Sequence, residues 1–342
     1  MMPRLNFRLL APALLALSAL VAPVAPAQAQ GQAQAQAQAQ AEAVQFPARA
    51  VRIVVPFPPG GSTDITARLV AARLQQIWQQ PVTVDNKPGA AANIGTETVA
   101  HSAPDGHTIL LGTTALPISA ATFDKLGYDP VKDLLPVMLV STIANVLVVN
   151  PSLPVDTVQA FIDYAKANPG KLNYASPGAA TGQRLTFELL KQTTGIDIVH
   201  IPYKGGAPAG QAVLAGEVEC MMMNVVEASP LLQAGRLRAL AVTTRERASQ
   251  LPAVPTLHET VSPGVDSSVW QGVLVPAGTP PGVVDKISRG WREALDSADI
   301  RGRLEGMGMK LVAGTPAEFD VFLKTEFAQW AQVAKAGNIK AE

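Results

Sequence analysis

The sequence predicts an α/β protein with mainly parallel sheets. Short β-branched and apolar runs alternate with segments whose apolar residues recur every three or four positions, as in successive β-α-β units. Most of the 28 prolines and 27 glycines fall between these runs, which favours short tight connections over disorder. The stretch from Pro47 to the C-terminus is long enough for two lobes with separate cores.

The predicted elements follow one another in alternating order. Strands are expected at Arg52–Pro56, Val82–Asp85, Thr108–Gly112, Val146–Asn150, Leu172–Ala175, Ile198–Ile201, Val218–Asn224, Leu237–Thr243 and Gly272–Val275. Helices are expected at Asp64–Gln79, Asn93–His101, Thr157–Asn168, Thr181–Thr194, Pro208–Ala215 and Pro281–Ser297, with a C-terminal pair after Asp299.

The N-terminal residues are typical of an export signal. Arg4 and Arg8 precede an apolar run from Leu9 to Val24, and Ala27-Gln28-Ala29 is a small-x-small cleavage site. The run is short for a membrane span and is interrupted by proline. We therefore expect residues 1–29 to be removed and the Gln/Ala-rich residues 30–46 to form a disordered leader. No later segment is long and apolar enough to insert directly into a membrane.

Charge and composition argue against several functional classes. The 27 basic and 27 acidic residues give a formal net charge of zero without any basic block, so nucleic-acid binding has no electrostatic support. The four histidines lie far apart and outside metal-ligand patterns, so neither a metal nor another cofactor is expected. Cys220, the single cysteine, precedes Met221–Met223 in an apolar run and is interpreted as a core residue.

The most informative segment is a strand that runs through a double-glycine turn into a helix. The strand Arg52–Pro56 ends at Pro58-Pro-Gly-Gly61, and the helical pattern begins at Asp64. Such a turn leaves free backbone N–H groups at the helix start, and these groups attract an anion. The candidate ligand-binding residues in this loop are Phe57, Pro58, Gly60, Gly61, Ser62 and Asp64.

Two questions about this loop stay open at the level of sequence. The turn is either a ligand site or a connector whose helix is capped by Ser62 or Thr63. Asp64 would repel an anionic ligand if its side chain pointed inward. It therefore either holds the loop by hydrogen bonding or meets an ammonium group on the ligand.

A second segment repeats this design. The strand Leu172–Ala175 enters the turn Ser176-Pro-Gly-Ala-Ala-Thr-Gly182, and a helix follows. Two such turns facing each other across a cleft would form a clamp for a carboxylate. Micromolar binding requires about 8 kcal/mol, which four or five charge-assisted hydrogen bonds of roughly 1.5–3 kcal/mol each would supply. The candidates in this turn are Ser176, Gly178 and Thr181.

Three further candidates, Thr113, Thr114 and Asn224, lie at the ends of predicted strands, where clefts of α/β proteins usually open. Lys204 lies in a loop with Gly205 and is either a ligand contact or a solvated surface lysine. Position in the chain alone does not decide between these two roles.

No catalytic residue is assigned, because the sequence lacks a nucleophile elbow, a zinc-protease motif and a phosphate-binding loop. The alternative is an exported α/β hydrolase that uses Ser62 or Ser176 as its nucleophile. It would need a histidine near one of these serines, and the spacing along the chain does not suggest one.

Segments spread from about Pro47 to the C-terminus match, in one order, those of a known family. They are Arg52-Ile-Val-Val-Pro-Phe-Pro-Pro-Gly-Gly61 with Asp64, Val82-Thr-Val-Asp-Asn-Lys-Pro-Gly89, Pro104-Asp-Gly106, Tyr128-Asp-Pro130, Ala165-Lys-Ala-Asn-Pro-Gly-Lys-Leu172, Ile201-Pro-Tyr-Lys-Gly205, Leu237-Arg-Ala-Leu-Ala-Val242, Leu251-Pro-Ala-Val-Pro-Thr256 and Pro276-Ala-Gly-Thr-Pro280. The chain thus resembles the periplasmic solute-binding receptors of tripartite tricarboxylate transporters, the Bug or TctC family.

The resemblance implies a two-lobed periplasmic-binding-protein fold, type II-like, whose lobes close on a small organic acid. Residues 47–147 and 244–342 would form the first lobe and residues 148–243 the second. The loops matching Phe57–Ser62 and Ser176–Thr181 would pinch a ligand carboxylate, largely through backbone amides and ordered water. The chain would then be a periplasmic monomer that delivers its ligand to membrane transporter subunits, or the ligand-sensing subunit of a signalling system.

The second loop departs from the family pattern. Where the family usually has Ser-Pro-Gly-x-Gly-Ser/Thr-x-x-His, this chain has Ser176-Pro-Gly-Ala-Ala180-Thr-Gly-Gln-Arg184. Ala180 in place of a glycine narrows backbone freedom. Arg184 in place of the histidine is either a surface residue or a fixed cation near the cleft that favours a second carboxylate on the ligand.

Overall fold

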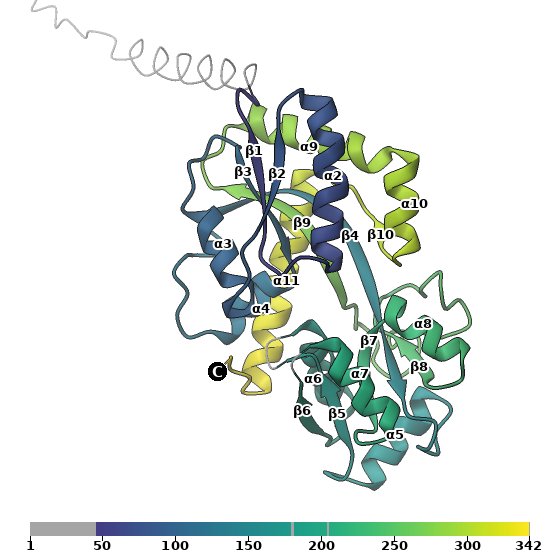
Figure 1. Ribbon diagram of the computed structural model, residues 1–342. Coiled ribbons are helices and arrows are strands. Elements are labelled where there is room, and N and C mark those ends of the chain that lie inside the picture. The colour runs from purple at the N-terminus through teal and green to yellow at the C-terminus, as the bar shows by residue number, and fades with distance from the viewer. Residues whose placement is uncertain (1–45, 179–180, 204, 342) are drawn as a thin grey trace, which may run out of the picture.

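Two lobes joined by crossing segments make up the protein (Figure 1). The computed structural model describes residues 46–178, 181–203 and 205–341. The predicted export signal and the leader up to residue 45 lie outside the described residues, as do Ala180 and Lys204.

The first lobe is built on a sheet with the strand order β2-β1-β3-β9-β4. β1, β2 and β3 are parallel, whereas β9 is antiparallel to both β3 and β4. The strands are β1 (Val51–Val55), β2 (Val82–Asn86), β3 (Thr108–Thr113), β9 (Ser268–Pro276) and part of β4 (Leu134–Val149), with β10 (Lys310–Leu311) paired to β4. The helices are α2 (Ser62–Trp78), α3 (Asn93–Ala100) after the 3-10 turn Ala90–Ala92, α4 (Ala115–Thr122), α9 (Pro281–Asp296), α10 (Ala298–Gly306) and α11 (Pro316–Ala336).

Helices cover both faces of this sheet, as the alternation along β1 illustrates. Ile53 and Val55 belong to a core completed by α2, α9 and α10, whereas Val54 belongs to one completed by α3, α4 and α11. All three side chains are fully buried. A strand covered on both faces needs an apolar residue at nearly every position, which explains why Arg52 is the one polar residue in Val51-Arg-Ile-Val-Val55.

The second lobe repeats this arrangement. β6, β5 and β7 lie side by side and parallel, β4 is antiparallel to β7, and β8 is antiparallel to β4. The strands are β5 (Asn173–Ser176), β6 (Val199–Pro202), β7 (Cys220–Asn224) and β8 (Arg238–Val242). The helices are α5 (Val158–Ala167), α6 (Gly182–Thr194), α7 (Gly206–Ala215) and α8 (Val225–Gln233).

Two segments cross between the lobes. β4 pairs with β9 as far as Ala144 and with β7 from Asn145 onward, so a single strand serves both sheets (Figure 1). The second crossing lies against it. The amide of Thr243 donates to the carbonyl of Asn145, and the amide of Ser267 donates to the carbonyl of Thr243.

The lobe borders differ in one place from the sequence expectation. The border expected at 147/148 falls within β4, just after its change of partner. The border expected at 243/244 precedes a segment whose Leu257 and Val265 are buried in the core of the second lobe. Because these apolar side chains complete that core, the chain returns to the first lobe only at Ser268, where β9 begins.

The C-terminal helix contacts both lobes. Trp330 and Val333 of α11 form one apolar cluster with Ile118 of α4 and Leu185 of α6. Gln192 Nε2, also on α6, donates to the carbonyl of Val333 (3.0 Å). The lobes are therefore held together beside the cleft as well as at the crossing segments.

Most predicted elements are present, including the C-terminal pair α10 and α11, but both sheets are mixed rather than mainly parallel. Parallel pairing is limited to β1–β3 and to β5–β7, because β4, β8, β9 and β10 all pair antiparallel. α4 and α8 were not predicted. Each contains an internal proline, Pro117 or Pro230, which disguises a helical pattern.

Candidate carboxylate-binding cleft

The loop of the first lobe ends at an uncapped helix start. Gly61 is the N-cap of α2, with extended backbone (φ −78°, ψ 169°) and no side-chain hydrogen bond to the helix end. Among the described residues, no group accepts a hydrogen bond from the backbone N–H groups of Ser62, Thr63 or Asp64. Neither Ser62 nor Thr63 therefore caps α2. The positive end of a 17-residue helix is left open instead.

Asp64 holds this loop from beneath. Its carboxylate, 3% exposed, accepts hydrogen bonds from the Gly60 amide (2.9 Å), Asn86 Nδ2 (3.0 Å) and Arg68 Nε (3.0 Å). Asn86 Nδ2 also donates to the carbonyl of Phe57 (3.1 Å). Burial raises the pKa of Asp64, but the hydrogen bonds from Arg68, Gly60 and Asn86 outweigh it and hold the pKa below its ordinary value. Of the two roles open at the level of sequence, Asp64 has the loop-holding one.

The rest of the loop is small and accessible. Gly60 has a φ of +91°, a conformation that favours glycine, and nothing lies within 4 Å of the position that a Cβ would take on Gly60 or Gly61. Phe57 packs against the core of the first lobe, whereas Pro58 and Ser62 are exposed. A ligand atom can therefore approach the start of α2 without displacing a side chain.

In the described part of the second-lobe loop, side chains hydrogen-bond to the backbone. Thr181 caps α6: its hydroxyl oxygen accepts from the Arg184 amide (3.4 Å), and its hydroxyl donates to the carbonyl of Gly178 (2.9 Å). Ser176 is fully buried and also donates to the carbonyl of Gly178 (2.9 Å). In the described part of this loop, the carbonyl of Gly178 therefore accepts hydrogen bonds from both hydroxyl groups.

A histidine lies beside a candidate serine, contrary to the sequence expectation. Ser176 Oγ is 2.6 Å from Nε2 of His200. The contact arises because β5 and β6 are parallel, with Tyr174 and His200 as register partners. Burial, together with the positive charges of Arg184 and Lys191, lowers the pKa of His200 to about 4.

This serine–histidine pair lacks the features of a catalytic one. Ser176 is inaccessible, and its hydroxyl lies within hydrogen-bonding distance of both the Gly178 carbonyl and Nε2 of His200. A catalytic serine needs its Oγ open to a substrate. A pKa of about 4 also makes the imidazole a weak base at neutral pH. No described carboxylate hydrogen-bonds to His200, so the orienting member of a triad is missing as well.

Thr113 and Thr114 order the first lobe and bring it close to the second. Thr113 Oγ1 accepts from the Ala115 amide (3.2 Å), and Thr114 Oγ1 accepts from the Trp270 amide (3.0 Å). The methyl carbon of Thr114 lies 3.7 Å from the position that a Cβ would take on Gly182, the first residue of α6. The end of β3 in one lobe thus faces the start of α6 in the other.

Arg184 and Asn224 have defined surroundings. Arg184, half-buried in the first turn of α6, interacts with Tyr174, and its charge contributes to the lowered pKa of His200. It is therefore packed within the second lobe rather than being a bare surface residue. Asn224 ends β7, where it pairs in register with Asn145 of β4.

Sequence reasoning missed several polar residues near the predicted loops. Arg68 and Asn86 hold Asp64, and Gln271 Nε2 donates to Ser62 Oγ (3.5 Å). The spacing of Arg68, four residues after Asp64 on one helix, was a usable signal. No sequence signal pointed to Gln271, because it lies in the first half of β9, which was not predicted as a strand.

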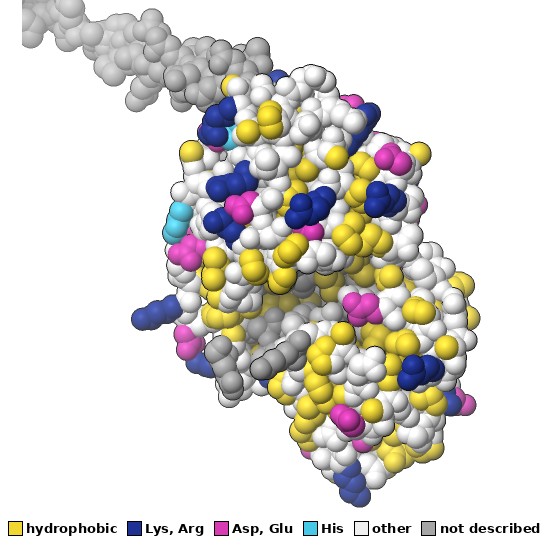
Figure 2. All heavy atoms as spheres, viewed as in Figure 1, with side chains coloured by type: hydrophobic (Ala, Val, Ile, Leu, Met, Phe, Trp, Pro, Cys, Tyr) yellow, Lys and Arg dark blue, Asp and Glu magenta, His cyan; other side chains and the backbone are white. Residues whose placement is uncertain are grey.

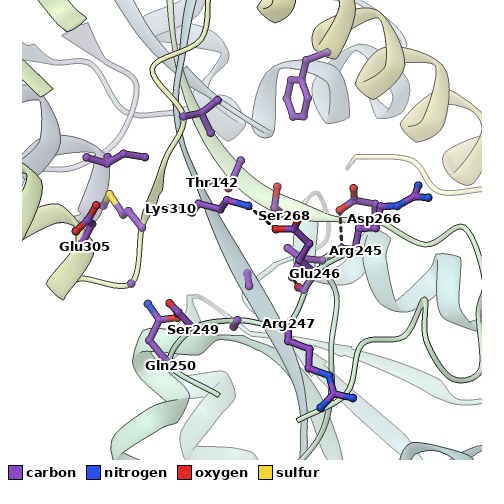
Figure 3. Close-up of a pocket in the computed structure, with 18 of the residues that line it drawn as sticks. Thr142, Arg245, Glu246, Arg247, Ser249, Gln250, Asp266, Ser268, Glu305 and Lys310 are labelled. Atoms are coloured by element: carbon purple, nitrogen blue, oxygen red, sulfur yellow. Dashed lines mark hydrogen bonds and ion pairs between the residues drawn. The ribbon is translucent and has the colours of Figure 1, made fainter. Parts of the chain in front are cut away.

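A separate cavity of about 880 Å³ lies against the crossing segments. Figure 3 shows its labelled residues, among them Thr142 of β4 and the ion pair between Lys310 Nζ and Glu246 Oε2 (2.7 Å), which joins the two lobes. None of the predicted site residues lines this cavity. Figure 2 shows a hollow between the lobes, where apolar and uncharged groups dominate the visible walls.

The described residues contain neither a metal-binding cluster nor a membrane-spanning helix. Within residues 46–178, 181–203 and 205–341, no group of three or more histidine, cysteine or acidic side chains is arranged to hold a metal ion. Over the same ranges, none of the helices has the length and apolar character needed to span a membrane.

Comparison with known proteins identifies the family. The family model described as tripartite tricarboxylate transporter family receptor matches residues 66–339. The chain belongs to this family. Its members are non-enzymatic solute-binding receptors, and the two-lobed α/β fold predicted from the sequence is confirmed.

Relatives and solved structures extend this similarity over most of the chain. Protein BugT of Bordetella pertussis is 37% identical over 86% of this chain and 91% of its own length. Rpa4515 of R. palustris, solved with adipate, is 36% identical with a TM-score of 0.75, covering 86% of this chain and 99% of that one. MatC of Rhodopseudomonas palustris, solved with malate, is 33% identical with a TM-score of 0.72, covering 84% of this chain and 99% of that one.

Proposed function

We propose that this protein is an exported periplasmic receptor that binds a small organic carboxylate between its lobes and delivers it, as a monomer, to a tripartite tricarboxylate-type membrane transporter. The carboxylate would bind at the start of α2, through the N–H groups of Ser62 and Thr63. The loop 176–181 would close on it from the second lobe.

The uncapped start of α2 is the observation that carries this proposal. A helix end without a side-chain cap is costly unless water or a ligand meets its N–H groups, and Asp64 is positioned to hold the preceding loop in shape. Dicarboxylates bound to two relatives of the same fold are consistent with this use. The predicted N-terminal signal supports export, because it has the charge, apolar run and cleavage site of one.

Thermal unfolding tests the proposal. The protein, unfolded and refolded to remove carried ligand, is mixed with di- and tricarboxylates, amino acids and aromatic carboxylates. At a concentration 100 times its Kd, a ligand adds about 2.7 kcal/mol of stability, which raises Tm by several degrees.

The amide of each active acid serves as its matched control and should give no shift, because it lacks the charge that the helix start attracts. If no acid raises Tm, and mass spectrometry finds no organic acid released from freshly purified protein, the receptor function is refuted.

A further inference from the structure

The second lobe presents an acidic side chain at the edge that faces the first lobe. Glu227 lies in the first turn of α8, just after β7 ends at Asn224, and its side chain is exposed. Its Oε2 is 3.5 Å from the position that a Cβ would take on Gly206, the first residue of α7. The carboxylate therefore lies between the starts of two neighbouring helices.

Contacts on both sides show that this edge faces the cleft. On one side, Gly182 of α6 lies against Thr114 of the first lobe. On the other side, Val226, the neighbour of Glu227, lies against Gly308 of the first lobe. Glu227 is thus placed between two points where the lobes meet.

The described surroundings of Glu227 hold its carboxylate in place. Asn224 hydrogen-bonds to the carboxylate, and no ion pair joins Glu227 to any described lysine or arginine. Although the side chain as a whole is exposed, partial burial of its carboxylate raises the pKa of Glu227 above its ordinary value, and the hydrogen bond with Asn224 offsets only part of this rise. Next to Asn224 in the β4–β7 pair lies Asn145, 1% exposed, whose amide nitrogen and oxygen both lack a partner among the described residues. This corner of the cleft thus retains unused hydrogen-bonding capacity beside a carboxylate.

We propose that Glu227 determines the class of ligand: a carboxylate that carries an ammonium group at its other end. The inference rests on the proposed function, since it takes the open start of α2 as the site of the ligand's carboxylate. A second carboxylate near Glu227 would be repelled, whereas an ammonium group would pair with it and use the amide oxygens nearby. Glu227 is thereby a specificity-determining residue.

Pairs of ligands that differ only in the distal group test this inference by calorimetry. Adipate is compared with 6-aminohexanoate, and succinate with 4-aminobutanoate, on the wild-type protein and on Glu227→Gln. We expect the wild type to bind the ω-amino acid at least about tenfold more tightly in the better-fitting pair, since one like-charge contact replaced by an attractive one has that order of effect. Glu227→Gln should abolish or reverse this preference.

Glu217→Gln is the matched control, because Glu217 is exposed at the opposite end of α7, and it should leave the preference unchanged. Glu227→Gln keeps the side-chain shape, so its Tm without ligand should not fall. Tighter binding of either dicarboxylate than of its ω-amino counterpart, or an unchanged ratio in Glu227→Gln, overturns the inference but leaves the receptor function standing. Failure of every carboxylate to bind counts against the receptor function itself.

Discussion

The two glycine loops share a sequence design, yet the structure uses them differently. The loop 57–62 leaves the start of α2 without a cap and is supported from beneath by the buried Asp64. In the described part of the loop 176–181, Thr181 caps α6 and Ser176 is buried beneath. One loop therefore offers hydrogen-bond donors, while the described part of the other has largely satisfied its own.

This difference assigns unequal roles within the proposed clamp. The first-lobe loop would supply most of the attraction for the ligand's carboxylate, because the helix start that it leads into has no side-chain cap and its residues are small and exposed, whereas Thr181 caps the helix after the other loop. The second-lobe loop would chiefly close the cleft, and its proximity to Thr114 through Gly182 fits that task. Similar sequences thus need not contribute equal binding energy.

Removal of the support beneath the first loop should have the largest effect. Asp64→Ala removes hydrogen bonds to Gly60, Asn86 and Arg68 at once. We expect the free energy of unfolding to fall by about 2–3 kcal/mol and carboxylate affinity to fall at least tenfold, as buried charged hydrogen bonds are lost and the loop is released. Urea unfolding and calorimetry measure the two effects.

Thr181→Ala is the matched change in the second loop. It should cost about 1 kcal/mol, because it removes one helix cap. If Thr181→Ala reduced carboxylate affinity more than Asp64→Ala did, the second-lobe loop rather than the first would supply most of the attraction for the carboxylate.

The pH dependence of stability should reveal the contribution of His200, which contacts Ser176 of the second loop. The pKa of His200 is lowered from 6.5 to about 4 by burial and by nearby positive charges, so the folded protein favours the neutral imidazole. Its contribution to stability is present above pH 6.5 and is lost as pH falls from 6.5 to about 4. We expect a loss on the order of 2 kcal/mol across that window, allowing for partial exposure of the ring.

Urea unfolding of the wild type and of His200→Gln between pH 7 and pH 4 measures this contribution. The variant should lose less stability than the wild type over that interval, because it has no imidazole to protonate. Parallel curves for the two proteins would show that His200 titrates normally and that the Ser176–His200 contact does not require a neutral ring.

Local sequence predicted the elements that depend on local geometry. The double glycine and the apolar spacing after Asp64 located both the turn and α2, because these features act within a few residues. The uncapped state of Gly61 was not predictable, since capping depends on how the loop approaches the helix. Nor was the Ser176–His200 contact, which arises from the register of β5 and β6 rather than from spacing along the chain.

Two features that depend on long-range contacts could not be predicted from local sequence. The first half of β4 contains Pro136, Thr142 and other residues that interrupt an apolar run, so the strand was expected only from Val146. The loop that contains Leu257 carries few apolar residues in any regular pattern, although it completes the second core. Such residues are recognised only once the surface they cover is known.

The central claim, that a carboxylate binds at the open start of α2, is tested most directly by filling that position. Gly61→Asp places a carboxylate at the N-cap, where the backbone is extended and nothing lies within 4 Å of a Cβ. An N-cap aspartate should stabilise the ligand-free protein slightly and occupy the same N–H groups, lowering carboxylate affinity roughly a hundredfold by removing two charge-assisted hydrogen bonds. Gly61→Ala, which adds bulk without a cap, should retain binding. Undiminished carboxylate binding by Gly61→Asp would contradict the account.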